Sequence, residues 1–308
     1  MGKFKQFSEE ERKEICRLYV EERKGASGIA KLFGCCATPI KRILTEEGIT
    51  LRSHRDSTKK YEYDETYFSQ IDTPDKAYWL GFIYADGFIC KAENGNPVLG
   101  ITLAESEPIE KIKIALKSNL PIRSYKKVNG YSDKSIEYKV AFHSKQMVED
   151  LEKWGCVERK TFKIKFPDFL SEELIPHFIR GYFDGDGSVY LHINKANNKE
   201  YVSLGVQFAG IHDFLSEMKK HFTFLNEEDK CLYQDTRKET DCWRIQLNSI
   251  IRALKLYHYM YKDCPQEICL SRKREKFENF IKDRGSETTI TNPIYGDAEY
   301  KSLCYIED

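Results

Sequence analysis

Apolar and polar residues alternate with a helical period over the first 50 residues of the chain. A capping box at Ser8-Glu9-Glu10-Glu11 opens a helix whose apolar residues share one face. A second helix is predicted over residues 27–33. The third begins at Thr38-Pro39, a cap followed by a first-turn proline, and ends at Gly48. This pattern predicts a small all-helical N-terminal domain.

From residue 66 the pattern changes to helices interleaved with short strands of alternating polarity. The order helix, strand, strand, helix, strand, strand, helix runs twice, and local matches recur at an offset of 105 residues, as in residues 140–144 and 245–249. Chance recurrence of a turn would not reproduce this context, so the sequence predicts an internal duplication. The first pass has helices at 73–87, 108–118 and 145–154, and strands at 88–90, 98–103, 122–127 and 137–142. The second has helices at 176–187, 213–222 and 250–259, and strands at 188–194, 202–208, 230–234 and 242–247.

One short pattern occurs in both passes, 100 residues apart. Residues 79–87 read Trp-Leu-Gly-Phe-Ile-Tyr-Ala-Asp-Gly, and residues 179–187 read Ile-Arg-Gly-Tyr-Phe-Asp-Gly-Asp-Gly. Each carries small residues at positions i and i+4, which share one face of a helix and permit close approach of another backbone. We therefore predict a helix–helix interface through four small residues: Gly81, Ala85, Gly181 and Gly185.

An aspartate closes each of these helices, Asp86 in the first and Asp186 in the second. A carboxylate at a helix C-terminus is disfavoured by the macrodipole, and two adjacent carboxylates repel each other. A cation between or beside them would relieve both effects, so the pattern predicts a paired metal site. The alternative is structural: Asp-Gly is a common turn, and glycine after a helix is an ordinary αL cap.

Composition and charge narrow the class of protein. The 308 residues are 41% apolar and 32% charged with a formal net charge of zero, so bulk electrostatic binding of nucleic acid is not indicated. Residues 1–60 nevertheless hold 14 Lys and Arg against 9 Asp and Glu, whereas residues 283–308 hold 2 against 6. Ten cysteines without a CxxC pair argue against structural zinc. Without an apolar run of membrane length or a hydrophobic leader, we expect a cytoplasmic protein of a reducing compartment, with no membrane partner.

The first 50 residues have the layout of a DNA-binding helix-turn-helix. The third helix turns its apolar residues inward and leaves Thr38, Lys41 and Arg42 outward. A basic segment with Arg52 and Arg55 follows it. The segment resembles homeodomain-like helix-turn-helix modules, over about 45 residues. A three-helix bundle with a solvated polar face is the structural alternative.

The two motif copies resemble the LAGLIDADG motif, and the duplicated order resembles the single-chain form of that family. Residues 177–189 and 270–277 are the most specific matches, and the resemblance covers residues 66–282. It implies an α+β fold of two pseudo-symmetric αββαββα repeats packed through their motif helices. With the helical domain in front, the predicted division of the chain is 1–50 helix-turn-helix, 51–65 basic linker, 66–165 first repeat, 166–282 second repeat and 283–308 acidic tail.

The same resemblance implies a homing endonuclease and assigns roles to residues at matching positions. Asp86 and Asp186 bind divalent metal, with Ala85 and Gly185 beside them, and two or more Mg²⁺ ions are expected, with Mn²⁺ as a substitute. Lys160 and Lys273, near the end of each repeat, assist hydrolysis; surface charge or a phosphate contact is their alternative role. The sixth motif position departs from the family pattern, being Tyr84 in one copy and Asp184 in the other.

Sequence reading is expected from side chains that alternate outward on the strands. The same rows could face water. The candidates are Ser188, Tyr190, His192, Asn194, Arg123, Lys127, Lys139, Arg237, Arg244 and Gln246.

The resulting expectation is a site-specific double-strand DNA endonuclease, a monomer that makes a staggered cut across the minor groove of a long pseudo-palindromic or asymmetric target. Its gene is expected in a phage or organelle genome, within an intron or freestanding. Two alternatives stay open: a non-cleaving DNA-binding regulator of the same fold, and an RNA maturase for a host intron. An intein is not expected, because the chain starts at Met1 and lacks a His-Asn ending. The acidic tail has no assigned function.

Overall fold

The computed structural model of the chain separates into two compact units, Met1–Glu62 and Tyr63–Asp308. Predicted DNA contacts Arg55, Lys127 and Arg237 lie outside the described residues, as does the side chain of Asn194 and most of the acidic tail. The structure describes residues 6–52, 60–91, 96–126, 136–160, 163–196, 199–226, 228–236, 241–262, 264–265 and 268–285, with the backbone alone for 194–201 and 284–285.

The smaller unit contains the three helices that the sequence pattern predicts. They are α1 (Glu9–Val20), α2 (Ala26–Leu32) and α3 (Ala37–Glu46). The capping box at Ser8 is present, and the apolar residues of the three helices form one buried cluster. The start of α3 differs from the expectation, since Cys36 is the N-cap and Thr38 lies inside the first turn.

The larger unit has a mixed α+β fold built around two four-stranded antiparallel sheets of identical topology. Their strand orders are β1-β2-β4-β3 and β5-β6-β8-β7, so the second sheet repeats the first. This confirms the predicted fold class. The strands are β1 (Gly87–Cys90), β2 (Val98–Leu103), β3 (Arg123–Lys126), β4 (Ile136–His143), β5 (Gly187–Ala196), β6 (Lys199–Gly210), β7 (Leu232–Gln234) and β8 (Trp243–Leu247).

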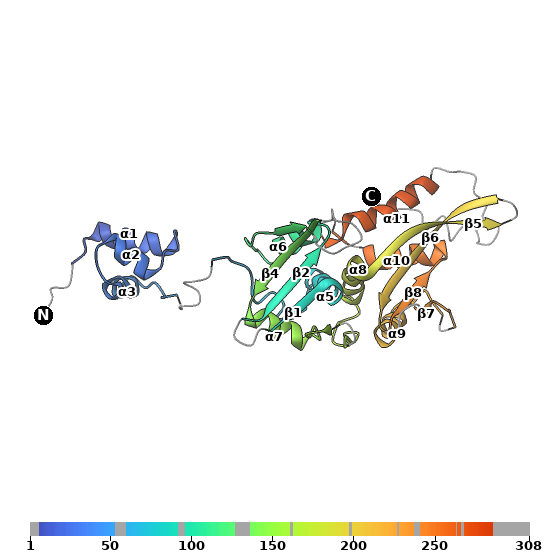
Figure 1. Ribbon diagram of the computed structural model, residues 1–308, viewed down its shortest axis with the longest axis horizontal. Helices are drawn as coiled ribbons and strands as arrows, with labels where there is room; N and C mark the ends of the chain where they lie inside the picture. Colours follow the sequence, from blue (N-terminus) through green and yellow to red (C-terminus); the bar gives the residue numbers. More distant parts are fainter. Residues whose placement is uncertain are drawn as a thin grey trace. The chain divides into compact units, whose positions relative to one another are not determined.

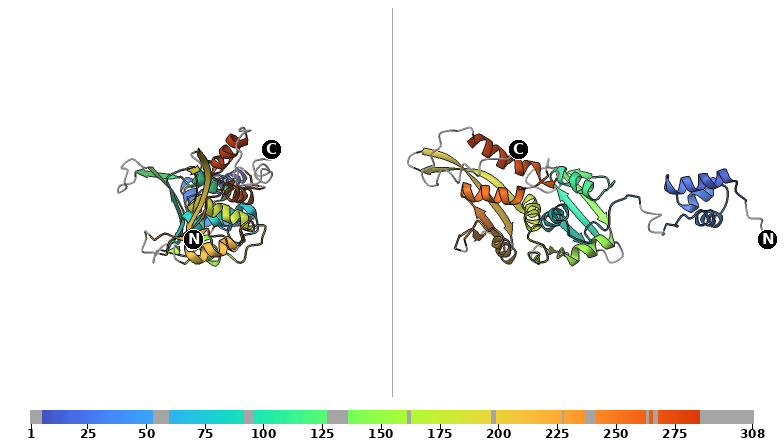
Figure 2. Two further views of the ribbon diagram at one scale, coloured as in Figure 1. Left: turned by 90° about the vertical axis from the view of Figure 1, so that its right-hand side faces the viewer. Right: turned by 180° about the vertical axis from the view of Figure 1, so that it is seen from behind.

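Two long helices, α5 (Pro74–Asp86) and α8 (Ile175–Asp186), pack against each other between the sheets (Figures 1 and 2). They contain the repeated motif, and we call them the motif helices. Thr73 caps α5 by accepting a hydrogen bond from the Lys76 amide, as its Thr-Pro-Asp sequence predicts. Eight of thirteen residues of α5 and eight of twelve of α8 are buried, because each helix contacts a sheet on one side and its partner on the other.

The remaining helices cover one face of each sheet and leave the other open. In the first half, α6 (Glu107–Ala115) and α7 (Lys145–Lys153) pack on strands β4 and β2. In the second half, α9 (His212–Lys220) and α10 (Ile250–Tyr261) pack on β6 and β8. One face of each sheet is therefore part of the core.

A further helix, α11 (Ser271–Gly285), follows α10 and packs against β5 (Figure 1). The sequence pattern did not predict it as a helix. Ten of its fifteen residues are charged or amide-bearing, and Phe277, Phe280 and Ile281 supply its buried apolar stripe. The helix also buries Lys273, which is only 3% exposed.

Candidate active site at the ends of the motif helices

The motif helices approach each other through glycines, in reciprocal contacts. A Cβ atom on Gly81 would lie 2.0 Å from the carbonyl oxygen of Phe178, and one on Gly181 would lie 1.9 Å from that of Tyr78. No side chain fits at these distances, so both positions require glycine. One turn later, a Cβ on Gly185 would lie 2.2 Å from Cβ of Ala85. All four predicted interface residues thus lie in the contact between α5 and α8.

The glycines that follow the aspartates have a different role from the αL cap considered above. Gly87 has φ −73° and Gly187 has φ −92°, so neither adopts the left-handed conformation. A Cβ on Gly87 would instead lie 2.7 Å from the Ile83 side chain, and one on Gly187 would lie 2.1 Å from the Phe183 ring. Close packing where the helix becomes a strand, and not backbone strain, requires glycine here.

Asp86 and Asp186 are the last residues of α5 and α8, and the structure brings them together. Burial and the neighbouring charge of Asp186 raise the pKa of Asp86 to about 6, although Lys273 and Lys160 act against the rise. Asp186 reaches solvent, but the protein atoms crowded around it still raise its pKa. The structure therefore places two carboxylates at the adjoining ends of two helices, where the charges of Lys160 and Lys273 act on both.

Each motif helix has a lysine hydrogen-bonded to its last carbonyls. Lys160 Nζ donates to Ala85 O at 2.7 Å. Lys273 Nζ lies within 2.7 Å of three carbonyl oxygens, those of Phe183, Asp184 and Gly187, and 3.3 Å from that of Gly185. Carbonyls at a helix end lack partners within the helix, so these ammonium groups act as C-terminal caps of positive charge. Burial lowers the pKa of both lysines, that of Lys273 to about 8.

A buried polar network lies beside α8. Its acid, Asp184, was noted from the sequence as a departure from the motif, but its hydrogen-bonding partners were not predicted. Asp184 is 2% exposed and faces away from the paired acids. It accepts hydrogen bonds from Tyr78 Oη at 2.8 Å, from the Leu270 amide at 2.6 Å and from Tyr261 Oη at 3.5 Å. Burial raises the pKa of Asp184 to about 6, despite the charge of Lys273 and these hydrogen bonds. Its partners come from three other segments of the chain, so no local sequence signal could have shown them.

Arg180 completes this network from one helical turn earlier. It is fully buried and donates to Met260 O at 2.7 Å and to Ile268 O at 3.1 Å. Its guanidinium also lies 5.3 Å from the centre of the Tyr78 ring. A buried cation near a buried carboxylate reduces the cost of removing both charges from water.

The open face of the first sheet carries cations. Lys139 pairs with Arg123 across β4 and β3 and with Thr102 across β4 and β2. Paired residues of antiparallel strands share a face, so Arg123 and Lys139 lie together. Phe88 lies on the same face, where it covers Gly100 and has the Lys139 ammonium 5.5 Å from its ring centre.

The open face of the second sheet is rich in neutral hydrogen-bonding groups. Its cross-strand pairs are Ser188 with Gln207, Tyr190 with Gly205 and Gln207 with Gln246. Gln246 Nε2 donates to Tyr190 Oη at 2.9 Å and to Asn248 Oδ1 at 3.2 Å. His192 and Arg244 lie on the same face, and each has a buried ring or guanidinium nitrogen (Nδ1 and Nε) without a partner among the described residues. The candidate strand residues that the structure describes thus gather on one face in each half.

In the smaller unit, the predicted DNA contacts divide into two groups. Thr38, Lys41 and Arg42 lie exposed along one side of α3, and Arg42 forms an ion pair with Glu46 at 3.4 Å. Arg52 instead stacks 4.0 Å from the centre of the Tyr19 ring and donates to the carbonyl oxygens of Tyr19, Arg23 and Lys24. Arg52 therefore caps the end of α1 in this structure.

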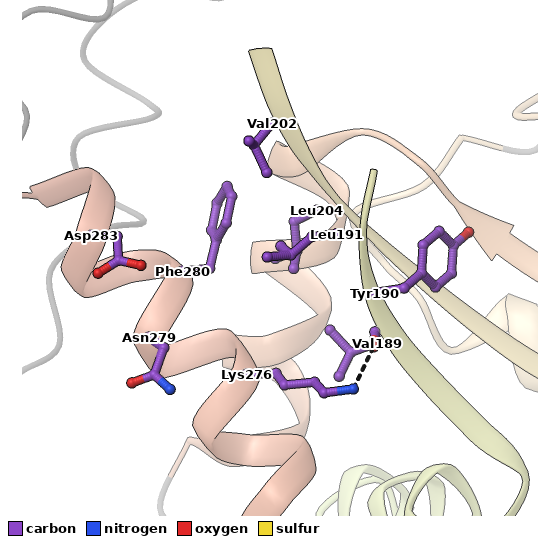
Figure 3. Close-up of a pocket in the computed structure, with 9 residues that line it drawn as sticks. All are labelled: Val189, Tyr190, Leu191, Val202, Leu204, Lys276, Asn279, Phe280 and Asp283. Carbon is purple, nitrogen blue, oxygen red and sulfur yellow. Dashed lines mark hydrogen bonds between the residues drawn. The ribbon is translucent and has the colours of Figure 1, made fainter. Parts of the chain in front are cut away.

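A separate cavity of about 630 Å³ lies between α11 and the strands β5 and β6 (Figure 3). Apolar side chains such as Val189, Leu191 and Phe280 line it, and Lys276 donates to Val189 O at 3.4 Å. The paired acids do not line it. Among the described residues, no group of three or more His, Cys, Asp or Glu side chains forms a metal cluster, and no helix has the length and apolar character of a membrane crossing.

No protein-family profile matches the sequence, and no curated protein matches it. Solved structures with a similar fold include the LAGLIDADG meganuclease I-AabMI bound to uncleaved DNA, with 16% identity and a TM-score of 0.47 over 75% of this chain and 98% of that one. I-CpaMI bound to uncleaved DNA has 13% identity and a TM-score of 0.48 over 75% and 97%. The LAGLIDADG homing endonuclease I-SmaMI bound to cleaved DNA has 14% identity and a TM-score of 0.43 over 76% and 96%. Likeness at this level does not by itself assign an activity to the chain.

Proposed function

We propose that the protein is a site-specific double-strand DNA endonuclease that hydrolyses phosphodiester bonds with divalent metal ions. The observation that carries this proposal is the pair Asp86 and Asp186 at the adjoining ends of two helices that pack backbone to backbone. A fold with no use for a cation gains nothing from crowding two carboxylates where both helix dipoles oppose them. Burial raises the pKa of both groups, and the charge of Asp186 adds to the rise at Asp86, so keeping both carboxylates ionised costs free energy that a bound cation would reduce.

The donor atoms at this site suit a hard divalent cation. The carboxylates of Asp86 and Asp186, with the main-chain carbonyls of Ala85 and Gly185 beside them, would hold two or more Mg²⁺ ions, and Mn²⁺ would substitute. When bound, such ions supply a water that is nucleophilic at neutral pH and stabilise the charge on the leaving oxygen.

The lysines provide fixed positive charge near the reacting phosphates. The three protons of the Lys273 ammonium are already directed at main-chain carbonyls, so its contribution is electrostatic stabilisation and not proton transfer. Lys160 has one described acceptor, Ala85 O, and keeps donors for a phosphate or a water. By the repeat to which each residue belongs, we call Asp86 with Lys160 the first half-site and Asp186 with Lys273 the second. Across the site, Lys273 lowers the pKa of Asp86 more than Lys160 does, and Lys160 lowers that of Asp186 more than Lys273 does. Two half-sites at adjoining helix ends would reach both strands across the narrow minor groove, which gives a staggered cut.

The open faces of the two sheets form the proposed DNA-reading surface. Arg123 and Lys139 on the first would contact phosphates or guanines, and Tyr190 and Gln246 on the second offer groups for base edges. Both half-sites belong to one chain, so a monomer suffices. In the smaller unit, the exposed Thr38, Lys41 and Arg42 side of α3 would enter a major groove and add affinity.

Incubation of the purified protein with a plasmid carrying its own gene locus, uninterrupted by the gene, tests this proposal. We expect one double-strand break in the presence of Mg²⁺ and none with a chelator. Binding of the same plasmid without a break in either condition would favour a regulator. Absence of both binding and cleavage, at the locus and in a randomised duplex library, would overturn the proposal.

A further inference from the structure

We propose that Tyr84 and Asp184, the sixth residues of the two motif patterns, are positioning residues that each hold the lysine-bearing segment of their own half-site. The inference rests on the proposed endonuclease function, because it assigns a task to residues behind the reacting groups. Neither residue faces the paired acids. Each contacts the stretch of main chain that leads to a lysine.

In the second half-site, two contacts fix the start of α11 to a single turn of α8. The Asp184 carboxylate accepts a hydrogen bond from the Leu270 amide at 2.6 Å, immediately before α11 begins. Three residues later, Lys273 Nζ donates to the carbonyls of Phe183 and Asp184 on the same turn. In the first contact a side chain of α8 binds the main chain before α11, and in the second a side chain of α11 binds the main chain of α8. Together they leave the Lys273 ammonium one fixed position at the C-terminal end of α8.

Other contacts of Asp184 keep this arrangement rigid. Tyr78 Oη ties the carboxylate to the first motif helix at 2.8 Å. Arg180 holds the chain two residues before Leu270 through the carbonyl of Ile268. A carboxylate with several donors and a nearby guanidinium has one orientation available, and that orientation serves the Leu270 amide.

In the first half-site, Tyr84 makes the corresponding contact with reversed polarity. Its hydroxyl donates to the carbonyl of Trp154, six residues before Lys160. Gly155 follows with φ +95°, and a Cβ there would lie 2.3 Å from Tyr84 Oη. The chain thus bends around the hydroxyl before it reaches the lysine. Tyr84 and Asp184 occupy equivalent positions in the two repeats. Each binds the main chain before its lysine, Tyr84 as a donor to a carbonyl and Asp184 as an acceptor from an amide.

Strand-resolved cleavage tests this inference, with a target duplex labelled differently on each strand. Lys160→Ala and Lys273→Ala first show which strand each half-site serves. We expect Asp184→Leu to slow the strand of the second half-site by about 10- to 100-fold relative to the other, and Tyr84→Phe to slow the opposite strand selectively. Asp184→Asn keeps an oxygen for the Leu270 amide and should restore balanced cutting. Equal slowing of both strands by Tyr84→Phe, or unchanged rates, would overturn the inference.

Hydrogen exchange gives a second readout that does not depend on cleavage. Asp184→Leu should speed exchange of the amides at 270–274, and Tyr84→Phe should speed exchange at 154–160, each without changing the other segment. Tyr84→Phe is nearly isosteric, so it keeps the test valid even where Asp184→Leu does not fold. If the wild-type protein does not cut DNA but the two variants show these exchange changes, the proposed function is rejected while the positioning contacts are supported. Cutting without segment-specific exchange changes would do the reverse.

Discussion

The two halves of the larger unit share one backbone plan and differ in the side chains packed behind their motif helices. In the first half, Tyr84 packs edge-on against Phe178, with ring centres 5.1 Å apart. In the second half, the equivalent pair is Asp184 with Tyr78, joined by a hydrogen bond. The glycine contacts at 81 and 181 are nevertheless almost identical, at 2.0 and 1.9 Å. Backbone approach therefore sets the symmetry of the interface, and the chemistry around it is free to diverge.

The lysines show a second difference between the halves. Lys273 is held by several carbonyls of α8, whereas Lys160 has one described hydrogen bond, to Ala85 O. The paired acids, by contrast, stand at equivalent places and both have raised pKa values. The two halves are therefore equivalent at the acids and differ in the residues packed behind them.

The largest effect on cleavage is expected from changes to the paired aspartates, where the two halves are most alike. Asp86→Asn and Asp186→Asn should each reduce Mg²⁺-dependent double-strand cleavage by about 10³-fold or more, because each removes a carboxylate from the metal site. Affinity for target DNA, measured in Ca²⁺ by fluorescence anisotropy, should be retained. Cleavage by either variant at the wild-type rate would show that the acids are not paired in function.

Alanine at the motif glycines tests whether the interface is truly reciprocal. Gly81→Ala and Gly181→Ala should each lower the free energy of unfolding by about 3 kcal/mol or more, since the added Cβ meets a main-chain carbonyl. Gly28→Ala is the control, because a Cβ there has no heavy atom within 4 Å, and alanine favours a helix. Denaturant unfolding measures all three, and a large difference between the first two would break the symmetry.

Removal of the lysines should affect stability unequally. Lys273→Met leaves several helix-end carbonyls without a donor and should cost about 2–3 kcal/mol, whereas Lys160→Met should cost about 1 kcal/mol. Thermal unfolding without metal separates this structural contribution from catalysis. Equal losses would mean that the two caps are equivalent despite their different contacts.

The smallest effect concerns pH. The pKa of Asp86 is raised to about 6 from its ordinary value near 4, so the folded protein binds this proton more tightly than the unfolded chain does. Stability without metal should therefore fall, by about 1–2 kcal/mol, as pH rises from about 4 to 7. Asp86→Asn should remove much of this slope, and Mg²⁺ should restore stability to the wild type at pH 7. A slope unchanged in the variant would exclude Asp86 as its source.

The sequence was sufficient for the parts of the structure that local patterns determine. Alternation and apolar spacing predicted the eight strands of the described residues and both motif helices, and small residues at i and i+4 marked the surface where those helices meet. The helix α11 was missed because its charged residues outnumber the apolar stripe of Phe277, Phe280 and Ile281. The contacts of Asp184 could not be predicted, since residues 78, 261 and 270 reach it only in the folded chain.

The tyrosine at position 78 also governs which surfaces can pair. If the second half met a copy of itself through its motif helix, the glycine contact would still close, but position 178 supplies a phenylalanine where Asp184 needs a hydroxyl. The buried carboxylate would then lose a donor, at a cost that a well-fitting backbone does not offset. If two first halves paired, Tyr78 of each copy would meet Tyr84 of the other, and no carboxylate would be present to accept its hydrogen bond. The hydrogen bond between Tyr78 and Asp184 thus favours the mixed pairing over both self-pairings, and disfavours dimers that join two like halves through their motif helices.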